Sequence, residues 1–334
     1  MTPLLEIDDL HVRFRQGGLL SRLLEGGPRE IAAVAGVSLA VGAGETVALV
    51  GESGSGKTTL ARAVIGLAAV RSGRIRFDGQ DIAGLGDRAM QPVRRRMALM
   101  FQDPVGSLSP RLTVRSLLSE PFRVHGLANR DLGAEAVRLL DLVGLPASFA
   151  DRYPHQLSGG QARRIGVARA VALEPRLVIA DEPTAGLDVS IQGEVLNLLN
   201  DLQSRLGISI LIITHNLSVV RHVADRTAVM YLGRIVEESP TEALFRHPRH
   251  PYARALLAAN PEPDPDAVPD RLELTGEVPS LLRRPPGCEF HPRCPFSRPR
   301  CAGEPPLLGR PADGRRWACH YPLDDHGQPP AAGL

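Results

Sequence analysis

One short run of residues has the types and the spacing that suit phosphate chemistry. Residues 51–59 read GESGSGKTT, which matches G-x-x-x-x-G-K-[ST], and they lie between a β-rich run at 45–50 and a helical pattern at 60–67. Glycines let backbone amides turn inward around phosphate oxygens, and the following helix presents its N-terminal amides to the same anion. Lys57 is the only lysine among 39 basic residues, as expected where a compact ammonium fits and a wider guanidinium does not. The run predicts a nucleoside triphosphate site.

Two adjacent carboxylates end an apolar run further along the chain. Residues 177–182 read LVIADE, which is typical of a buried parallel strand whose C-terminal end lies where open α/β sheets bind ligands. We expect Asp181 to hold Mg²⁺ together with the hydroxyl of Thr58, and Glu182 to act as general base on the attacking water. An acid pair at a strand end can instead cap a helix, but next to a phosphate loop the catalytic interpretation is favoured. The expected nucleotide contacts of the first run are Gly51, Ser53, Gly54, Ser55, Gly56, Lys57, Thr58 and Thr59.

A second phosphate-binding device lies between these two motifs. Residues 157–161 read LSGGQ and open a helical stretch that reaches Ala170. The hydroxyl of Ser158 and the amides of Gly159 and Gly160 suit an anion at a helix N-terminus, and an ordinary serine N-cap is the alternative interpretation. LSGGQ is the signature sequence of the ATP-binding cassette (ABC) family. From Leu5 to Glu238 the chain resembles a cassette subunit of an ABC transporter.

The resemblance implies roles for single residues elsewhere. Gln102 resembles the Q-loop glutamine that contacts Mg²⁺ and the attacking water, and His215 resembles the switch histidine that contacts the γ-phosphate. Asp188 resembles the D-loop aspartate at a dimer interface, and Phe14 lies where an aromatic ring stacks on adenine. A phenylalanine in an alternating strand is more often part of the core. The implied catalytic set is Glu182, His215, Gln102 and Lys57.

The family arrangement also implies that two cassettes share each ATP. Ser158, Gly159, Gly160 and Gln161 of one cassette would complete the site formed by residues 51–59 of another in a head-to-tail dimer. A single chain is then expected to hydrolyse ATP poorly. All the named motifs are present, so the chain is expected to be a hydrolysing subunit.

These elements predict an α/β fold, a P-loop NTPase cassette with a RecA-like core, an antiparallel β subdomain and an α-helical subdomain. The helical subdomain is expected at about 103–160, where residues 131–142 show helical periodicity, and by resemblance it receives the coupling helices of a membrane permease. The segment from Lys57 to Ser158 has no sustained heptads, which excludes the long coiled coil of a chromosome-maintenance ATPase. An insertion at 15–29 has no assigned role.

The C-terminal part of the chain differs in kind. All four cysteines, the only tryptophan and 19 of 29 prolines follow Glu238, which places a domain boundary near 239–250 and divides 1–240 from an irregular, cysteine-rich extension at 241–334. Clustered cysteines in a cytosolic chain favour metal over disulfides. The spacing suits an iron-sulfur cluster, while zinc, joined by His291 or His320, and reduced unliganded thiols stay open. The candidate ligands are Cys288, Cys294, Cys301 and Cys319.

A second resemblance narrows the family. Residues 247–257 read HPRHPYARALL, and FHPRCP and ACH follow, so the extension resembles that of cassette subunits from oligopeptide, dipeptide and nickel importers. This group is known for a [4Fe-4S] cluster on such cysteines, which favours the cluster over zinc. The resemblance implies a peptide importer. Its partners would be a second, paralogous ABC ATPase subunit, two transmembrane permease subunits and an extracytoplasmic solute-binding protein. The chain would lie at the cytoplasmic face of the cell membrane as a peripheral subunit.

Composition agrees with this interpretation. The chain is 43% hydrophobic and 23% charged, with a net charge of +2, so it is expected to be globular, to bind no nucleic acid and to have no direct membrane span. The alternatives are an ATPase for nickel or another small solute, or a soluble ABC ATPase of translation or DNA repair. The single cassette without long coils disfavours the soluble class.

Overall fold

The structure is a computed structural model that describes residues 2–16, 29–100, 106–259, 272, 276–309 and 313–331. The insertion predicted at 15–29 lies almost wholly outside these residues. The chain divides into two compact units. The helical unit comprises the residues up to Leu4, Val41–Thr46 and Leu85–Ile213, and the P-loop unit comprises Leu5–Ala40, Val47–Gly84 and Thr214–Leu334.

The helical unit is built on parallel strands. β7 (Leu177–Asp181) lies between β6 (Met97–Met100) and β8 (Ser209–Thr214). Every residue of β7 and β8 is buried. Both strands are nearly continuous apolar runs, as expected for parallel strands covered on both faces.

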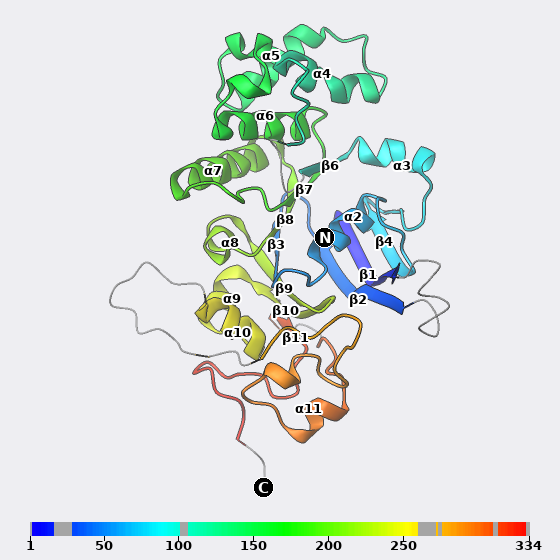
Figure 1. The fold of residues 1–334 in the computed structure, drawn as a ribbon, viewed down its shortest axis with the longest axis vertical. Coiled ribbons are helices and arrows are strands. Elements are labelled where there is room, and N and C mark those ends of the chain that lie inside the picture. Colours follow the sequence, from blue (N-terminus) through cyan, green and yellow to red (C-terminus); the bar gives the residue numbers. More distant parts are fainter. Residues whose placement is uncertain are drawn as a thin grey trace. The chain divides into compact units, whose positions relative to one another are not determined.

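Helices form the rest of this unit, and α4, α5 and α6 pack against one another (Figure 1). The helix predicted from the periodicity at 131–142 is confirmed as α5, with Asp131 as its N-cap and Ala136, Leu139 and Leu140 buried. The helices of the unit are α3 (Asp87–Arg94), α4 (Val114–Val124), α5 (Leu132–Leu142), η1 (Ala147–Asp151), η2 (Pro154–Gln156), α6 (Gly159–Val171) and α7 (Val189–Leu206).

The P-loop unit contains strands of two sheets. In the first sheet the order is β2-β1-β4-β5, with β1 antiparallel to β4, which confirms the predicted antiparallel part of the fold. In the second, β3 pairs in parallel with β9, and β9 pairs antiparallel with β10. The strands are β1 (Leu5–Gln16), β2 (Arg29–Val41), β3 (Thr46–Val50), β4 (Ser72–Phe77), β5 (Gln80–Asp81), β9 (Arg226–Tyr231) and β10 (Arg234–Pro240). The longer helices of this unit are α2 (Lys57–Val64), α8 (Leu217–Val223), α9 (Thr241–Arg246) and α10 (Pro251–Ala258).

The described part of the extension belongs to the P-loop unit. Its short elements are η3 (His291–Arg293), α11 (Pro299–Gly303) and β11 (Arg316–Trp317). β11 adds to the sheet beside β10, with Glu238 opposite Arg316. Arg316 Nε donates to Glu238 Oε2 at 2.7 Å, and its Nη2 donates to the carbonyl of Ser38 at 2.9 Å. The extension is therefore held by sheet pairing and by ion pairing.

Among the described residues, no helix is both long enough and apolar enough to span a membrane.

Candidate functional site

The phosphate loop has the strand–loop–helix form that its sequence predicts. It begins after β3, whose five residues are all buried, and ends at Gly56, the N-cap of α2. Lys57 is 8% exposed, and its Nζ donates to the carbonyl oxygens of Gly51 at 2.7 Å and Glu52 at 3.0 Å. The loop therefore folds around the ammonium group, which places a positive charge at the start of α2, where the helix dipole also favours an anion.

Two glycines of the loop are required by close backbone contacts. Gly51 and Gly56 have φ values of 154° and 104°. A Cβ on Gly51 would lie 2.1 Å from the carbonyl oxygen of Met230, and one on Gly56 would lie 2.2 Å from that of Ala33. Because both contacts are with backbone atoms, a larger residue cannot be accommodated by a rotamer change. The other contacts predicted in this loop are Ser53 and Gly54, both exposed, buried Ser55, and half-buried Thr58 and Thr59.

The two predicted acids lie at the end of β7 in the helical unit. Asp181 is 5% exposed, and Glu182 is half-buried with a φ of 52°, a left-handed conformation that few glutamates adopt. The backbone N–H of Glu182 donates to the carbonyl of Ile213 at 2.8 Å, which ties this turn to the end of β8. A strained backbone of this kind is typical of functional positions.

Sequence reasoning missed Arg163 as a part of this site. The side chain is 5% exposed and donates to the carbonyl oxygens of Pro183 at 2.9 Å and Ala185 at 3.0 Å. It therefore ties α6, which begins with the signature sequence, to the loop that follows Glu182. An arginine in a helix pattern is usually assigned to the exposed face, so no local signal indicated this role.

The signature sequence forms a helix N-terminus. Ser158 caps α6, accepting from the N–H of Gln161 at 3.2 Å, while Gln161 Oε1 accepts from the N–H of Ser158 at 3.0 Å. This reciprocal pair is a capping box. The serine N-cap interpretation is thus realised, and the hydroxyl lies at the helix start that an anion site requires. Gly159 and Gly160 form the first turn.

Asp188 has a similar position at the next helix. It caps α7, accepting from the N–H of Ile191 at 3.0 Å and from the hydroxyl of Ser190 at 2.8 Å. These hydrogen bonds, that from Ile191 first, hold the pKa of the exposed Asp188 carboxyl below its usual range. The residue is therefore a charged carboxylate at neutral pH.

The remaining predicted nucleotide contacts are spread over the chain. His215 is exposed directly after β8, and Phe14, on β1, is 46% exposed, so the side chain is outside the core. Both belong to the P-loop unit with residues 51–59, whereas Asp181, Glu182, the signature residues and Asp188 belong to the helical unit. Gln102 lies outside the described residues.

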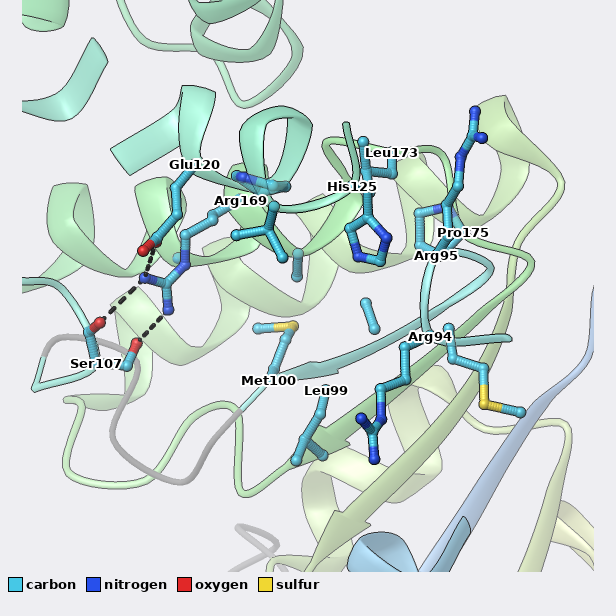
Figure 2. A pocket seen from close by; sticks show the side chains of 16 residues that line it. Arg94, Arg95, Leu99, Met100, Ser107, Glu120, His125, Arg169, Leu173 and Pro175 are labelled. Carbon is cyan, nitrogen blue, oxygen red and sulfur yellow. Dashed lines mark hydrogen bonds and ion pairs between the residues drawn. The ribbon is translucent and has the colours of Figure 1, made fainter. Parts of the chain in front are cut away.

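The helical unit also contains a pocket of about 270 Å³, which sequence reasoning did not predict (Figure 2). Its lining mixes apolar side chains with basic ones. At one end Arg169 donates to the backbone carbonyl of Ser107 at 3.1 Å and to its hydroxyl at 2.9 Å, and it pairs with Glu120 at 3.6 Å. Burial, and then the nearby charge of Arg95, lowers the pKa of His125 in the same pocket.

The structure brings the four cysteines together in the P-loop unit. Cys288, Cys294, Cys301 and Cys319 line one small cavity with His291 and His320, and none forms a disulfide. Burial raises the pKa of Cys288, and it raises those of Cys294 and Cys319 to about 11 and about 12, so these thiols are protonated at neutral pH. Among the described residues, no group of three or more histidine, cysteine, aspartate or glutamate side chains is arranged to hold a metal ion.

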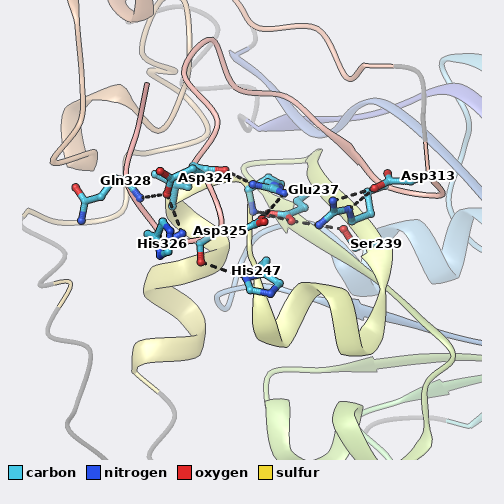
Figure 3. Close-up of polar contacts among 11 residues, drawn as sticks. Glu237, Ser239, His247, Asp313, Asp324, Asp325, His326 and Gln328 are labelled. Carbon is cyan, nitrogen blue, oxygen red and sulfur yellow. Dashed lines mark hydrogen bonds and ion pairs between the residues drawn. The ribbon is translucent and has the colours of Figure 1, made fainter. Parts of the chain in front are cut away.

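A buried glutamate attaches the HPRHPY run to the sheet (Figure 3). Glu237, fully buried in β10, accepts from the backbone N–H groups of Arg249 at 2.9 Å and His250 at 2.7 Å. Burial raises the pKa of Glu237 to about 7 and lowers that of His250 to about 3. Further along, His247 and Arg249 contact Asp325 of the C-terminal segment.

The fold and the loop around Lys57 define a P-loop ATP-binding protein. A family model described as ABC transporter matches residues 34–185, and one described as Oligopeptide/dipeptide transporter, C-terminal region, matches residues 236–301. Among solved structures, the ATP-binding cassette MJ0796, a dimer in a post-hydrolysis state with ADP and Pi, gives a TM-score of 0.62 at 26% identity, covering 71% of this chain and 98% of that one. The cbiO1 protein of Clostridium perfringens, part of the ABC transporter complex cbiONQ, gives a TM-score of 0.63 at 28% identity. The match covers 73% of this chain and 91% of that one.

Curated relatives match over most of the chain. A Sinorhizobium fredii protein named as a peptide ABC transporter ATP-binding protein, y4tS, is 51% identical over 87% of this chain and 82% of its own length. A Brucella ovis protein named as a peptide import ATP-binding protein is 46% identical over 95% of this chain and 98% of its own length. A Bacillus subtilis protein named as an oligopeptide transport ATP-binding protein, YkfD, is 42% identical over 95% of this chain and 95% of its own length. The chain therefore belongs to the ATP-binding proteins of the ABC transporter family, in the group that carries the oligopeptide/dipeptide transporter C-terminal region.

Proposed function

We propose that this chain hydrolyses ATP to power the uptake of peptides, as the ATPase subunit of a binding-protein-dependent importer. One observation carries the proposal: the similarity to the Brucella ovis peptide import ATP-binding protein covers 95% of the chain, so it includes the extension as well as the cassette. The extension is also matched by the oligopeptide/dipeptide transporter model. Peptide import therefore has better support than transport of nickel or another small solute.

The P-loop unit supplies the phosphate contacts of this proposal. Lys57 and the first amides of α2 hold the β- and γ-phosphates, since the ammonium group already lies inside the loop. The hydroxyl of Thr58 is an oxygen ligand that suits Mg²⁺, and the carboxylate of Asp181, from the helical unit, is a second; the ion would neutralise phosphate charge. Phe14, exposed on β1, stacks on the adenine ring.

The helical unit supplies the base. Glu182 accepts a proton from the attacking water as the water oxygen bonds to the γ-phosphorus and the bond to the ADP oxygen breaks. The left-handed backbone at Glu182, tied to β8 through Ile213, supports the assignment because it fixes the direction of the side chain. Gln102 orients the same water, and His215 donates to the γ-phosphate.

Hydrolysis in this proposal takes place in a dimer of cassettes. Ser158, Gly159, Gly160 and Gln161 contact the phosphates bound to a second cassette, a paralogue of this chain, and Asp188 lies at the interface. The exposed start of α6 supports this role because its hydroxyl and glycine amides are at the surface. MJ0796, which shares the fold, was solved as a dimer.

Two transmembrane permease subunits and an extracytoplasmic solute-binding protein complete the importer. The pocket of Figure 2 is the proposed permease site, since its apolar and basic lining suits a short helix with an acidic or polar end. The chain then acts as a peripheral subunit at the cytoplasmic face of the membrane.

The four cysteines are proposed to hold a [4Fe-4S] cluster, with zinc as the alternative occupant. Their common cavity and the lack of disulfides among them support the proposal. The described side chains are not arranged around an ion, so a bound metal has to draw the thiols together and deprotonate them. The test is oxygen-free purification followed by analysis of iron, sulfide and zinc. If only zinc is found, the site holds a structural zinc ion instead of a cluster. If no metal is found, the proposal of a metal site is refuted.

The function is tested first with Glu182→Gln. We expect ATP binding within about threefold of the wild type, turnover reduced about 1,000-fold, and an ATP-dependent dimer in gel filtration. Glu174→Gln is the matched control, because Glu174 lies in the same unit with the same φ of 52° and pairs with Arg138 at 3.3 Å. Undiminished turnover in Glu182→Gln would overturn the assignment of the base.

The transported solute is tested with the reconstituted importer. We expect ATP-dependent uptake of labelled peptides by vesicles that contain the permease, with the solute-binding protein added. Uptake of nickel in place of peptides would refute the peptide proposal and leave the ATPase intact. ATPase activity with no dependence on a permease would favour a soluble enzyme.

A further inference from the structure

The phosphate loop contains a negative charge of its own. Glu52 follows Gly51 directly, and its carbonyl oxygen accepts from Lys57 Nζ at 3.0 Å. Its side chain is one-quarter exposed. An unpaired carboxylate so close to the bound phosphates would repel them and would compete for Lys57. ATP binding to the loop therefore requires a neighbouring group that neutralises the carboxylate of Glu52.

Arg293 of the extension is the group that neutralises Glu52. Its Nη1 and Nη2 donate to the two carboxylate oxygens of Glu52 at 2.8 and 2.9 Å, a bidentate pair. The arginine side chain is 7% exposed. These hydrogen bonds hold the pKa of Arg293 above its usual range. The carboxylate is thus neutralised and fixed in direction, which a flexible surface pair does not achieve.

Aromatic residues fix Arg293 in turn. Its guanidinium lies over the ring of Tyr231, 5.9 Å from the centroid. The rings of Tyr231, Tyr252 and Phe290 contact one another, with centroids 4.6 to 5.4 Å apart. Tyr252 also reaches the loop directly, because its hydroxyl oxygen accepts from the N–H of Glu52 at 3.0 Å. Both the backbone and the side chain of Glu52 are therefore held from outside the loop.

We propose that Arg293 is a positioning residue for ATP binding, which neutralises Glu52 and holds the phosphate loop in its binding conformation. The inference rests on the assignment of residues 51–59 as the ATP site. It gives the extension a part in the nucleotide site, since Arg293 ends η3 and lies next to Cys294. It predicts that nucleotide affinity depends on a residue 241 positions away from the loop.

The test is a charge-rescue series in the full chain, with ATP affinity measured by calorimetry. Arg293→Met leaves Glu52 unpaired and is expected to weaken ATP binding about tenfold. Glu52→Gln in the same background removes the unpaired charge and is expected to recover most of that loss. Arg246→Met is the control, because Arg246 is an exposed extension arginine that pairs only weakly with Glu242, at 3.5 Å.

Salt dependence separates charge from damage to the fold. Repulsion by an unpaired Glu52 is screened, so the defect of Arg293→Met should shrink as ionic strength rises to about 0.5 M. Arg293→Lys keeps the charge and should bind ATP better than the methionine variant, even where the latter folds poorly. A double variant that binds as weakly as Arg293→Met, with no response to salt, would refute the proposal. Failure of the wild type to bind ATP would instead refute the ATP site.

Discussion

The helices α2 and α6 both begin at small residues suited to phosphate, but their first turns are built differently. α2 starts at Gly56 in a left-handed conformation, and no side chain of the described residues caps it. α6 starts at Ser158, whose capping box with Gln161 satisfies one N–H at each end of the first turn. The first turn of α2 has no side-chain cap, which is typical of a helix start that binds an anion, whereas the first turn of α6 is capped by its own side chains.

Their surroundings differ as well. Gly56 is pressed against the backbone of Ala33, while a Cβ on Gly159 would meet nothing within 4 Å. The start of α2 is thus shaped by residues far away in sequence, Ala33 and Met230. The start of α6 is shaped mainly by its capping box, although Gly160 lies close to the side chain of Ile191. A phosphate site that works within one chain needs a rigid cradle, and a surface that works against a partner needs exposure.

The same substitution at both helix starts should have opposite outcomes. Gly56→Ala adds a Cβ at a φ of 104° and 2.2 Å from a carbonyl oxygen, so we expect about 4 kcal/mol of lost stability and no measurable ATP binding. Gly159→Ala should change stability by no more than about 0.5 kcal/mol. Urea denaturation and ATP calorimetry measure both. Equal effects at the two positions would remove the contrast between a cradle and an open helix start.

The attachment of the HPRHPY run to β10, through Glu237 and His250, is tested by the pH dependence of stability. Burial raises the pKa of Glu237 from 4.5 to about 7, so its contribution to stability is present below pH 4.5 and is lost as pH rises through 7. Burial lowers the pKa of His250 from 6.5 to about 3, so its contribution is present above pH 6.5 and is lost as pH falls through 3. Between pH 4.5 and 6.5 the two slopes oppose each other.

Replacing either Glu237 or His250 should reveal how the other residue alone makes the free energy of unfolding depend on pH. In Glu237→Gln the free energy of unfolding should rise by about 3 kcal/mol from pH 4.5 to 6.5, whereas the wild type stays nearly level. His250→Gln should show the reverse, a fall that continues to pH 7. The slope is measured by denaturation at a series of pH values. A level profile for both variants would show that neither group titrates abnormally.

The sequence predicts the features that short patterns encode, but not the contacts between residues that lie far apart along the chain. The cassette fold, the strand before Lys57 and the helix at α5 follow from short patterns, so each was predictable. The gathering of the cysteines also followed from composition. The pair of Arg293 with Glu52 joins residues 241 positions apart. The FHPRCP run that contains Arg293 gives no local sign of a partner in the phosphate loop.

Burial of polar side chains was equally hidden. Arg163 occupies a helix position that a charge pattern assigns to solvent, but its two carbonyl partners make burial favourable. Phe14 shows the opposite case, since an apolar residue in a strand is nearly half exposed. Such residues depend on which groups the fold brings to them, and that information is not local.

A smaller effect than those of Gly56→Ala and Glu237→Gln distinguishes a helix cap from a phosphate contact at Ser158. Ser158→Ala removes the cap of α6 and should lower stability by about 1 kcal/mol. Thr113→Ala is the matched control, because Thr113 caps α4 in the same unit by accepting from the N–H of Ser116 at 3.3 Å. We expect the same loss of stability in both variants and a lower ATPase rate only for Ser158→Ala, with ATP affinity of the single chain unchanged. If both variants hydrolyse ATP at the wild-type rate, Ser158 is a cap alone, and the start of α6 contributes to the fold but not to a shared site.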